Sequence, residues 1–246
     1  MARLVLVHGA FAGAWCWERV TGPLRDAGHD VAALDMPGAG DDPAPIEGAT
    51  LDAYAERTAR RRPRMSARAI LVGHGMGGIA ITQAAERCRE HVAALVYVAA
   101  FRPGDGQSLV DLTQLPEGAG DGVQANIVVG GEPPAATLPD EAAREVLFGA
   151  CGDDDAAWGV ARIRPQPLAP FVTPVQLGGA VDAIPRAYVM CLRDAAIPPP
   201  LQRRMSRERP CEPVLELDTD HSPWLSCPDE LADVLLRIVG PPPAPA

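Results

Sequence analysis

The sequence lacks a long apolar run and an excess of basic residues, and both absences narrow the range of functions. No stretch approaches the roughly 18 consecutive apolar residues that a helix needs to span a bilayer. Residues 1–7 enter an apolar run directly, without the basic segment, long apolar core and cleavage site of a signal peptide. Asp and Glu outnumber Lys and Arg by 32 to 22, and the net charge of -10 argues against binding to nucleic acid or to an anionic membrane. We therefore expect a cytoplasmic protein that acts on a small molecule.

Clusters of metal-ligating residues are also missing from the sequence. The six cysteines are widely spaced, none belongs to a CxxC pair, and no Cys/His cluster has metal-ligand spacing. Reduced and mostly buried thiols are the simpler interpretation. The sequence therefore predicts no metal site, and it is compatible with a homodimer.

What the sequence does contain is a regular alternation of strands and helices. The 246 residues, 47% of them hydrophobic and 22% charged, suffice for one large α/β domain. Short apolar runs predict strands that are buried on both faces. They alternate with segments in which the apolar residues have the spacing of a helix. The expected strands are 4–7, 31–34, 69–72 and 94–98, and the expected helices are 15–27, 51–62 and 79–89. This alternation predicts a mostly parallel central sheet flanked by helices.

The alternation lapses between residues 102 and 185, which are rich in proline and glycine and show no strong strand pattern. Short helices with acidic residues in their first turns are expected there, at 140–148 and 153–163. The later elements are strand 187–192, helix 200–207, strand 214–217 and helix 228–239. We predict three parts: a core of 1–101 and 186–239, a small helical cap of 102–185 inserted after the strand at 94–98, and a disordered tail at 240–246.

The segment 72–78, VGHGMGG, lies between a predicted strand and a predicted helix. A nucleophile elbow has the pattern G-x-S-x-G in this context, because the flanking glycines allow a sharp turn that exposes the central side chain. Gly75 occupies the nucleophile position, so every part of the motif is present except the serine. A plain glycine-rich turn is the competing interpretation. The segment lacks the glycine spacing of a dinucleotide fingerprint and the GK[ST] of a P-loop.

Two further residues follow the elbow in an informative order. Asp194 comes just after the strand 187–192, and His221 comes in a loop after the strand 214–217. Nucleophile position, acid and histidine in this order are typical of α/β hydrolases, whose sites lie at the carboxyl ends of strands. We predict that His221 and Asp194 form a catalytic pair beside Gly75. The backbone amides of Ala10, after the first strand, and Met76 are predicted to form an oxyanion hole.

Three segments resemble the methylesterase and hydroxynitrile-lyase branch of the α/β-hydrolase superfamily, in particular its bacterial members. Residues 8–17 (HGAFAGAWCW) resemble its opening, residues 191–198 (CLRDAAIP) its acid loop and residues 220–226 (DHSPWLS) its histidine loop. The resemblance extends from about residue 3 to residue 239. It implies an α/β-hydrolase fold and an ester-, thioester- or cyanohydrin-type site under a small helical cap, without a metal or organic cofactor. It also implies a serine at position 75, where this sequence has glycine.

The missing serine leaves three interpretations open. The first is an enzyme in which His221, oriented by Asp194, acts directly as general base or acid in a cyclisation, elimination, carbon–carbon cleavage or water addition. The second is a carboxylesterase, thioesterase or lactonase held as an inactive variant in which glycine has replaced the serine. The third is a protein that only binds a ligand. We favour the first. The acid, the base and the oxyanion loop all still fit their pattern, which argues against the third, and alanine would be the commoner engineered replacement, which argues against the second.

The expected substrate is a small, largely apolar compound that carries a carbonyl group. The Ala, Arg and Pro usage suggests a GC-rich actinobacterial source, where such enzymes often serve secondary metabolism such as polyketide and antibiotic biosynthesis. Phe11, His74 and Trp158 are predicted to contact the substrate, although core packing explains Phe11 and Trp158 about equally well. His8 is expected to fix the oxyanion loop rather than to react.

Overall fold

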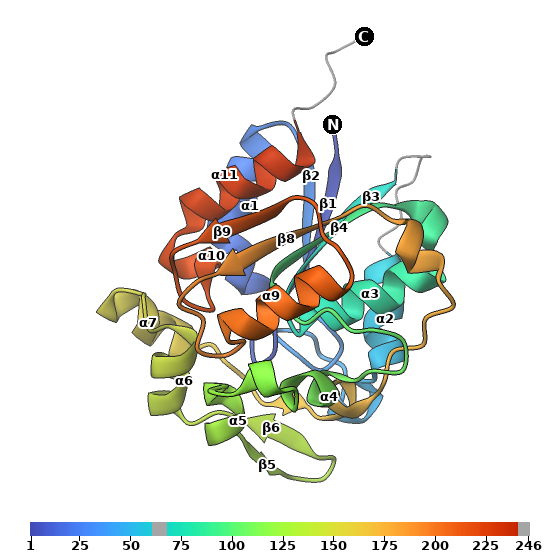
Figure 1. Cartoon of the computed structure of the whole chain (residues 1–246). Helices are drawn as coiled ribbons and strands as arrows, with labels where there is room; N and C mark the ends of the chain where they lie inside the picture. The colour runs from blue at the N-terminus through green and yellow to red at the C-terminus, as the bar shows by residue number, and fades with distance from the viewer. Residues whose placement is uncertain (61–67, 241–246) are drawn as a thin grey trace.

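The central sheet of the protein is built from parallel strands. The computed structural model describes residues 1–60 and 68–240. Within these residues, six strands form one sheet in the order β2-β1-β3-β4-β8-β9 (Figure 1), and every neighbouring pair is parallel. The strands are β1 Arg3–Val7, β2 Asp30–Leu34, β3 Ala69–Gly75, β4 Val92–Ala100, β8 Arg186–Cys191 and β9 Val214–Leu217. Because all six run in the same direction, their carboxyl ends meet at one edge of the sheet.

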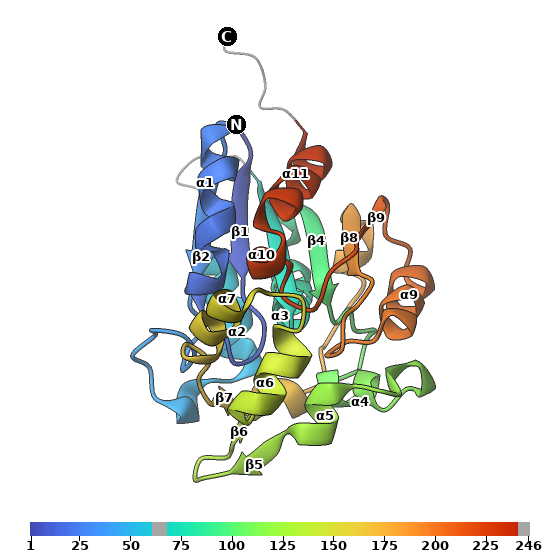
Figure 2. The ribbon, with the colours of Figure 1, turned by 90° about the vertical axis from the view of Figure 1, so that its left-hand side faces the viewer.

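Helices cover both faces of this sheet, which explains why its strands read as continuous apolar runs. On one face α1 Glu18–Asp26 packs against α11 Pro228–Val239, and on the other α2 Leu51–Arg60 packs against α3 Gly77–Arg87 (Figures 1 and 2). The helix α9 Pro199–Glu208 lies beside β8. The predicted parallel sheet flanked by helices is confirmed. In the part of the chain that the structure describes, no helix combines the length and the apolar character that crossing a membrane requires.

Several element bounds differ from the predicted ones. The strand β3 extends to Gly75 instead of ending at residue 72, so the glycine-rich motif begins as strand. The helix expected at 15–27 starts as a 3₁₀ turn, Ala14–Trp17, and continues as α1. The last two residues of the expected helix 51–62, and all of the predicted tail but Gly240, lie outside the described residues. Further 3₁₀ turns are Ile46–Gly48, Arg89–His91, Pro116–Gly118 and Ala180–Ala183, and the short helix α10 spans Pro223–Ser226.

The segment between β4 and β8 forms a cap over the carboxyl edge of the sheet (Figure 2). Its helices are α4 Leu109–Thr113, α5 Gly122–Asn126, α6 Asp140–Leu147, α7 Asp153–Val160 and α8 Ala169–Val172. It also contains an antiparallel sheet formed by β5 Val128–Gly130, β6 Ala135–Thr137 and β7 Gln166–Pro167. The cap is thus mixed, whereas the sequence predicts helices alone. Strands of two or three residues are too short to show an alternating pattern, and β5 is exposed throughout.

Candidate active site

Gly75 lies at the sharp turn between β3 and α3. Its φ of 53° is in the left-handed region, which costs a residue with a Cβ roughly 1–2 kcal/mol and costs glycine very little. The turn is fixed by the backbone N–H of Phe101, which donates to the carbonyl oxygen of Gly75 at 3.0 Å. A Cβ built on Gly78 would lie only 2.1 Å from the carbonyl oxygen of Phe101. The glycine-rich segment is therefore a tight strand-to-helix turn, as the sequence predicts.

The imidazole ring of His221 faces this turn. A Cβ built on Gly75 would lie 3.2 Å from Nε2 of His221, so the ring sits directly beside the space of a side chain at position 75. On its other side, Nδ1 lies 2.9 Å from Oδ2 of Asp194. A carboxylate only accepts hydrogen bonds, so Nδ1–H donates and the lone pair of Nε2 points toward Gly75. The structure thus brings together the three positions that the sequence singles out.

Asp194 is held in place by several donors. Its Oδ1 accepts from the backbone N–H groups of Ala196 and Ile197, both at 2.8 Å, and its Oδ2 accepts a 2.9 Å bond from Nε2 of Gln202. Gln202 is fully buried, and its Oε1 accepts from the backbone N–H of Cys191 at 3.2 Å. Sequence reasoning misses Gln202. The signal that could have revealed it is a polar residue on the buried face of α9.

The surroundings of His221 favour its protonated form. Burial by itself lowers the pKa of the ring, because the imidazolium loses its hydration. The charge of Asp194 and its hydrogen bond to the ring act in the opposite direction, supported by Asp220 and Asp121, and together they raise the pKa above its ordinary value of 6.5. Above this raised pKa the neutral ring can accept a proton at Nε2, and below it the ring can donate one. His221 is therefore suited to general acid–base chemistry.

Replacing Asp194 by asparagine is expected to lower the pKa of His221. Asparagine keeps the size of the side chain but removes the charge, so that burial becomes the dominant effect on the ring. The Hε1 resonance of His221, followed by NMR against pH, should titrate above 6.5 in the unmodified chain and below 6.5 in Asp194→Asn. Asp111→Asn is the control, because Asp111 caps α4 through Ser108, and it should leave the midpoint in place. An unshifted midpoint in Asp194→Asn would contradict the assigned pair.

His74 lies outside the lining of the cavity beside Gly75, contrary to the prediction that it contacts the substrate. It is 2% exposed, its Nε2–H donates to the backbone carbonyl oxygen of His221 at 2.7 Å, and the two ring centroids are 4.5 Å apart. Burial lowers the pKa of His74 well below its ordinary value, and so does the neighbouring His221, so that the ring stays neutral. His74 therefore positions the loop that carries His221.

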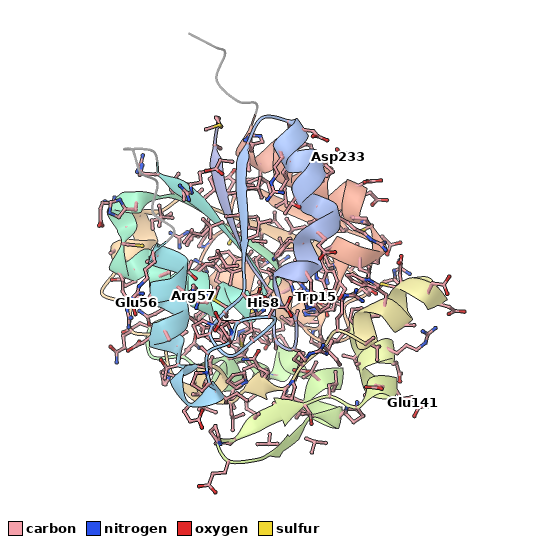
Figure 3. The ribbon with its side chains drawn as sticks, turned by 180° about the vertical axis from the view of Figure 1, so that it is seen from behind. His8, Trp15, Glu56, Arg57, Glu141 and Asp233 are labelled. Carbon is pink, nitrogen blue, oxygen red and sulfur yellow. The ribbon has the colours of Figure 1, made fainter. Side chains whose placement is uncertain are left out.

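The loop after β1 carries Ala10, whose backbone amide is predicted to form an oxyanion hole with that of Met76. Ala10 and Met76 both line the cavity, and within the described residues neither backbone amide has a hydrogen-bond acceptor. His8 fixes this loop where the sheet meets the cap (Figure 3). Its Nε2 accepts from the backbone N–H of Met36 at 3.1 Å, so its Nδ1–H donates to the carbonyl oxygen of Gly9 at 2.7 Å. Burial lowers the pKa of His8, in keeping with the neutral ring and the structural role that the sequence predicts.

A cavity of about 240 Å³ opens beside Gly75 and His221. Phe11 lines it, with its ring packed edge-on against Phe171 at 6.4 Å. Apolar side chains form most of the wall, and they come from both the core and the cap: Phe101, Leu109, Val110, Val123, Ile127, Val129, Leu147, Leu168, Ala196 and Ile197. A few polar groups in an apolar cavity are typical of a small-molecule site.

Trp158 lies away from this cavity, contrary to its predicted contact with the substrate. Its indole packs edge-on against Trp15 at 5.3 Å, and the guanidinium of Arg162 lies 4.0 Å from its ring centroid. Trp15, labelled in Figure 3, in turn packs against Trp224 at 5.4 Å. The indole of Trp158 therefore packs between the cap and the core.

Similarity to known proteins assigns the chain to a family. A sequence model described as the alpha/beta hydrolase family matches residues 4–234. The chain belongs to the alpha/beta hydrolase family. This α/β hydrolase is 34% identical to putative methylesterase 11 of Arabidopsis thaliana over 98% of its length, and it spans 64% of that longer protein. It is 33% identical to methylesterase 7 of the same plant, with 96% of this chain and 95% of that protein covered.

Solved structures agree with this assignment. The structure of polyneuridine aldehyde esterase superposes with a TM-score of 0.87 at 25% identity, covering 98% of this chain and all of that one (100%). A histidine-to-alanine variant of tomato methylketone synthase I, in complex with β-ketoheptanoate, superposes with a TM-score of 0.83 at 27% identity over 97% of each chain. The predicted α/β-hydrolase fold is confirmed. In the described part of this α/β hydrolase, no group of three or more His, Cys, Asp and Glu residues is arranged to hold a metal ion.

Proposed function

We propose that this α/β hydrolase uses His221 and Asp194 as an acid–base pair on a small, apolar carbonyl compound, without a covalent intermediate. Gly75 stands where the nucleophile-elbow pattern places a serine. The observation that carries the proposal is the direction of the His221 ring, whose Nε2 faces the space above Gly75 at 3.2 Å from a Cβ built there. Removal of the nucleophile costs a serine hydrolase on the order of a million-fold in turnover. The base and the oxyanion hole remain available for other chemistry.

The geometry supports proton abstraction beside a carbonyl group. A substrate carbonyl oxygen that accepts from the amides of Ala10 and Met76 places its neighbouring carbon near Nε2 of His221. The C–H bond breaks, the proton goes to Nε2, and the electron pair forms an enolate whose oxygen the two amides stabilise. The protonated ring can then return the proton to another atom. Cyclisation, elimination, carbon–carbon cleavage and water addition all use such steps.

The size and lining of the cavity support a small apolar substrate. An apolar cavity of about 150 Å³ is large enough to hold benzene, and the cavity here measures about 240 Å³. The β-ketoheptanoate bound to methylketone synthase I is a keto acid and supports a carbonyl-bearing ligand for this chain as well. We propose a natural-product intermediate of the polyketide type, because such compounds carry carbonyl groups along an apolar chain.

Ester hydrolysis is the second candidate, because the relatives include methylesterases. In that case His221 would activate a water molecule instead of a serine hydroxyl, and the same two amides would stabilise the tetrahedral intermediate. A carboxylesterase, thioesterase or lactonase of this kind would form the same type of hydrolysis product as an esterase with a serine, but its turnover would be slow. The intact pair of His221 and Asp194 argues against a protein that only binds its ligand.

Hydrogen–deuterium exchange tests the proposal without knowledge of the natural substrate. We expect the protein to accelerate exchange at the carbons beside the carbonyl of 4-phenyl-2-butanone in D₂O by at least about 10²-fold. The reference is the rate with the same concentration of imidazole, and 10²-fold is the lower end of the range that positioned acid–base catalysis contributes. Proton NMR measures the loss of signal. Hydrolysis of methyl phenylacetate without exchange of the ketone would favour the second candidate. Binding of the ketone without either reaction would indicate a ligand-binding protein.

A further inference from the structure

Besides His221, three polar side chains line the cavity: Thr113, Asp121 and Gln124. Asp121 lines it, and among the described lining residues it is the single carboxylate. It is 7% exposed and lies in the cap at the start of α5, whereas Gly75 and His221 belong to the core. A ligand in the cavity therefore meets acid–base groups on the core side and a carboxyl group on the cap side.

The protein itself engages the two oxygens of Asp121 unequally. Oδ1 accepts a 2.9 Å bond from the backbone N–H of Gln124, which caps α5. The backbone N–H of Val123 also interacts with the Asp121 carboxylate. Oδ2 accepts a long bond of 3.3 Å from Nε2 of Gln124, and the same Nε2 also donates to the carbonyl oxygen of Thr113 at 2.9 Å. No Lys or Arg side chain is present in the described lining of the cavity. A buried carboxyl oxygen with weak protein partners gains most from a hydrogen bond to the ligand.

The position of Asp121 relative to the catalytic pair is fixed by the backbone. The N–H of Gly122 donates to the carbonyl oxygen of Ala195 at 2.8 Å, which ties the start of α5 to the loop that carries Asp194. The charge of Asp121 also acts on His221 across the same cavity. Burial raises the pKa of Asp121 above its ordinary value, against the effect of the hydrogen bonds from Gln124 and Val123. In either protonation state the carboxyl group can accept a hydrogen bond from a hydroxyl group.

We infer that Asp121 binds a hydroxyl group of the substrate while the carbonyl group of the same molecule lies at Ala10 and Met76. The substrate class is then a hydroxy carbonyl compound. The placement of the carbonyl rests on the proposed function, whereas the role of Asp121 in binding can be tested separately. A cationic amine is the competing ligand for a carboxylate, but an ammonium group loses far more hydration free energy than a neutral hydroxyl group does on entering this apolar cavity.

Two ligands that differ by one hydroxyl test the inference, namely 4-hydroxy-4-phenyl-2-butanone and 4-phenyl-2-butanone. We expect the unmodified chain to bind the hydroxy ketone about tenfold more tightly, as one net hydrogen bond allows, with affinities from calorimetry and ligand integrity checked by NMR. In Asp121→Ser the preference should fall to about one, because serine still caps α5 but lacks the second oxygen. Asp121→Thr repeats the measurement if the serine variant is unstable. Asp111→Asn, the control that changes an acid outside the cavity, should keep the preference.

Retention of the full preference in Asp121→Ser would overturn the inference. Failure of the unmodified chain to bind either ketone, or tighter binding of 4-amino-4-phenyl-2-butanone, would overturn the ligand class. His221→Ala should keep the preference for the hydroxyl, because it leaves Asp121 in place. Loss of exchange in that variant and loss of preference in Asp121→Ser therefore report on separate claims.

Discussion

A Gly75→Ser variant is expected to hydrolyse p-nitrophenyl acetate at least about 10²-fold faster than the unmodified chain. This is a small part of the roughly million-fold in turnover that the nucleophile contributes in a serine hydrolase. The new hydroxyl would lie next to Nε2 of His221, which can remove its proton as the oxygen attacks the ester. The amides of Ala10 and Met76 would stabilise the resulting oxyanion. Release of p-nitrophenolate, with a burst that reports the acyl-enzyme, measures the gain.

The gain should stay incomplete because the turn is shaped around glycine. A φ of 53° costs serine roughly 1–2 kcal/mol. Its Cβ would also lie 3.2 Å from Nε2 of His221, so the ring has to move by a few tenths of an ångström. Gly75→Ala carries the same strain without the hydroxyl and is the matched control, for which no gain is expected. A folded Gly75→Ser protein that hydrolyses the ester no faster than Gly75→Ala would show that His221 is not placed to activate a nucleophile at this position.

The positions of the candidate catalytic residues could be predicted from the sequence, because each of them lies at or after the end of a buried strand. Gly75 ends β3, Asp194 follows β8 and His221 follows β9. In a parallel sheet the carboxyl ends of all strands share one edge, so residues far apart in sequence meet there whatever the length of the segments between them. Apolar runs that are several residues long mark such strands reliably, and the glycines of the turn mark the point where strand gives way to helix.

The residues that position the site could not be predicted in the same way, because their roles depend on the direction of a side chain. His74 directly precedes Gly75, yet its buried ring lies outside the lining of the cavity and meets the carbonyl group of His221. Gln202 becomes a partner of Asp194 only when α9 docks on the sheet. Trp158 is an aromatic residue in the cap, which is why the sequence predicts a contact with the substrate. In the structure its indole packs against Trp15 and Arg162 instead.

Replacing His221 by alanine is expected to slow α-hydrogen exchange of 4-phenyl-2-butanone by at least about 10²-fold, because positioned acid–base catalysis contributes 10² to 10⁴. The change removes Nε2 but leaves the amides of Ala10 and Met76, so the ketone should still bind. His91→Ala is the matched control, since His91 lies in an exposed 3₁₀ turn with its side chain 40% exposed. Imidazole added to the His221→Ala protein should restore part of the rate, which separates loss of the base from loss of the fold.

The pH dependence of the same reaction identifies the base. Exchange requires the neutral ring, so the rate should rise with pH and level off above the pKa of His221, which Asp194, Asp220 and Asp121 raise above 6.5 against the effect of burial. The neighbouring ring of His74 should add no second step, because burial keeps it neutral. In Asp194→Asn the rise should move to lower pH and reach a lower plateau, since a weaker base removes a carbon-bound proton more slowly. Exchange that proceeds at full rate in His221→Ala, or that shows no rise through this pH range, would assign the proton transfer to another group.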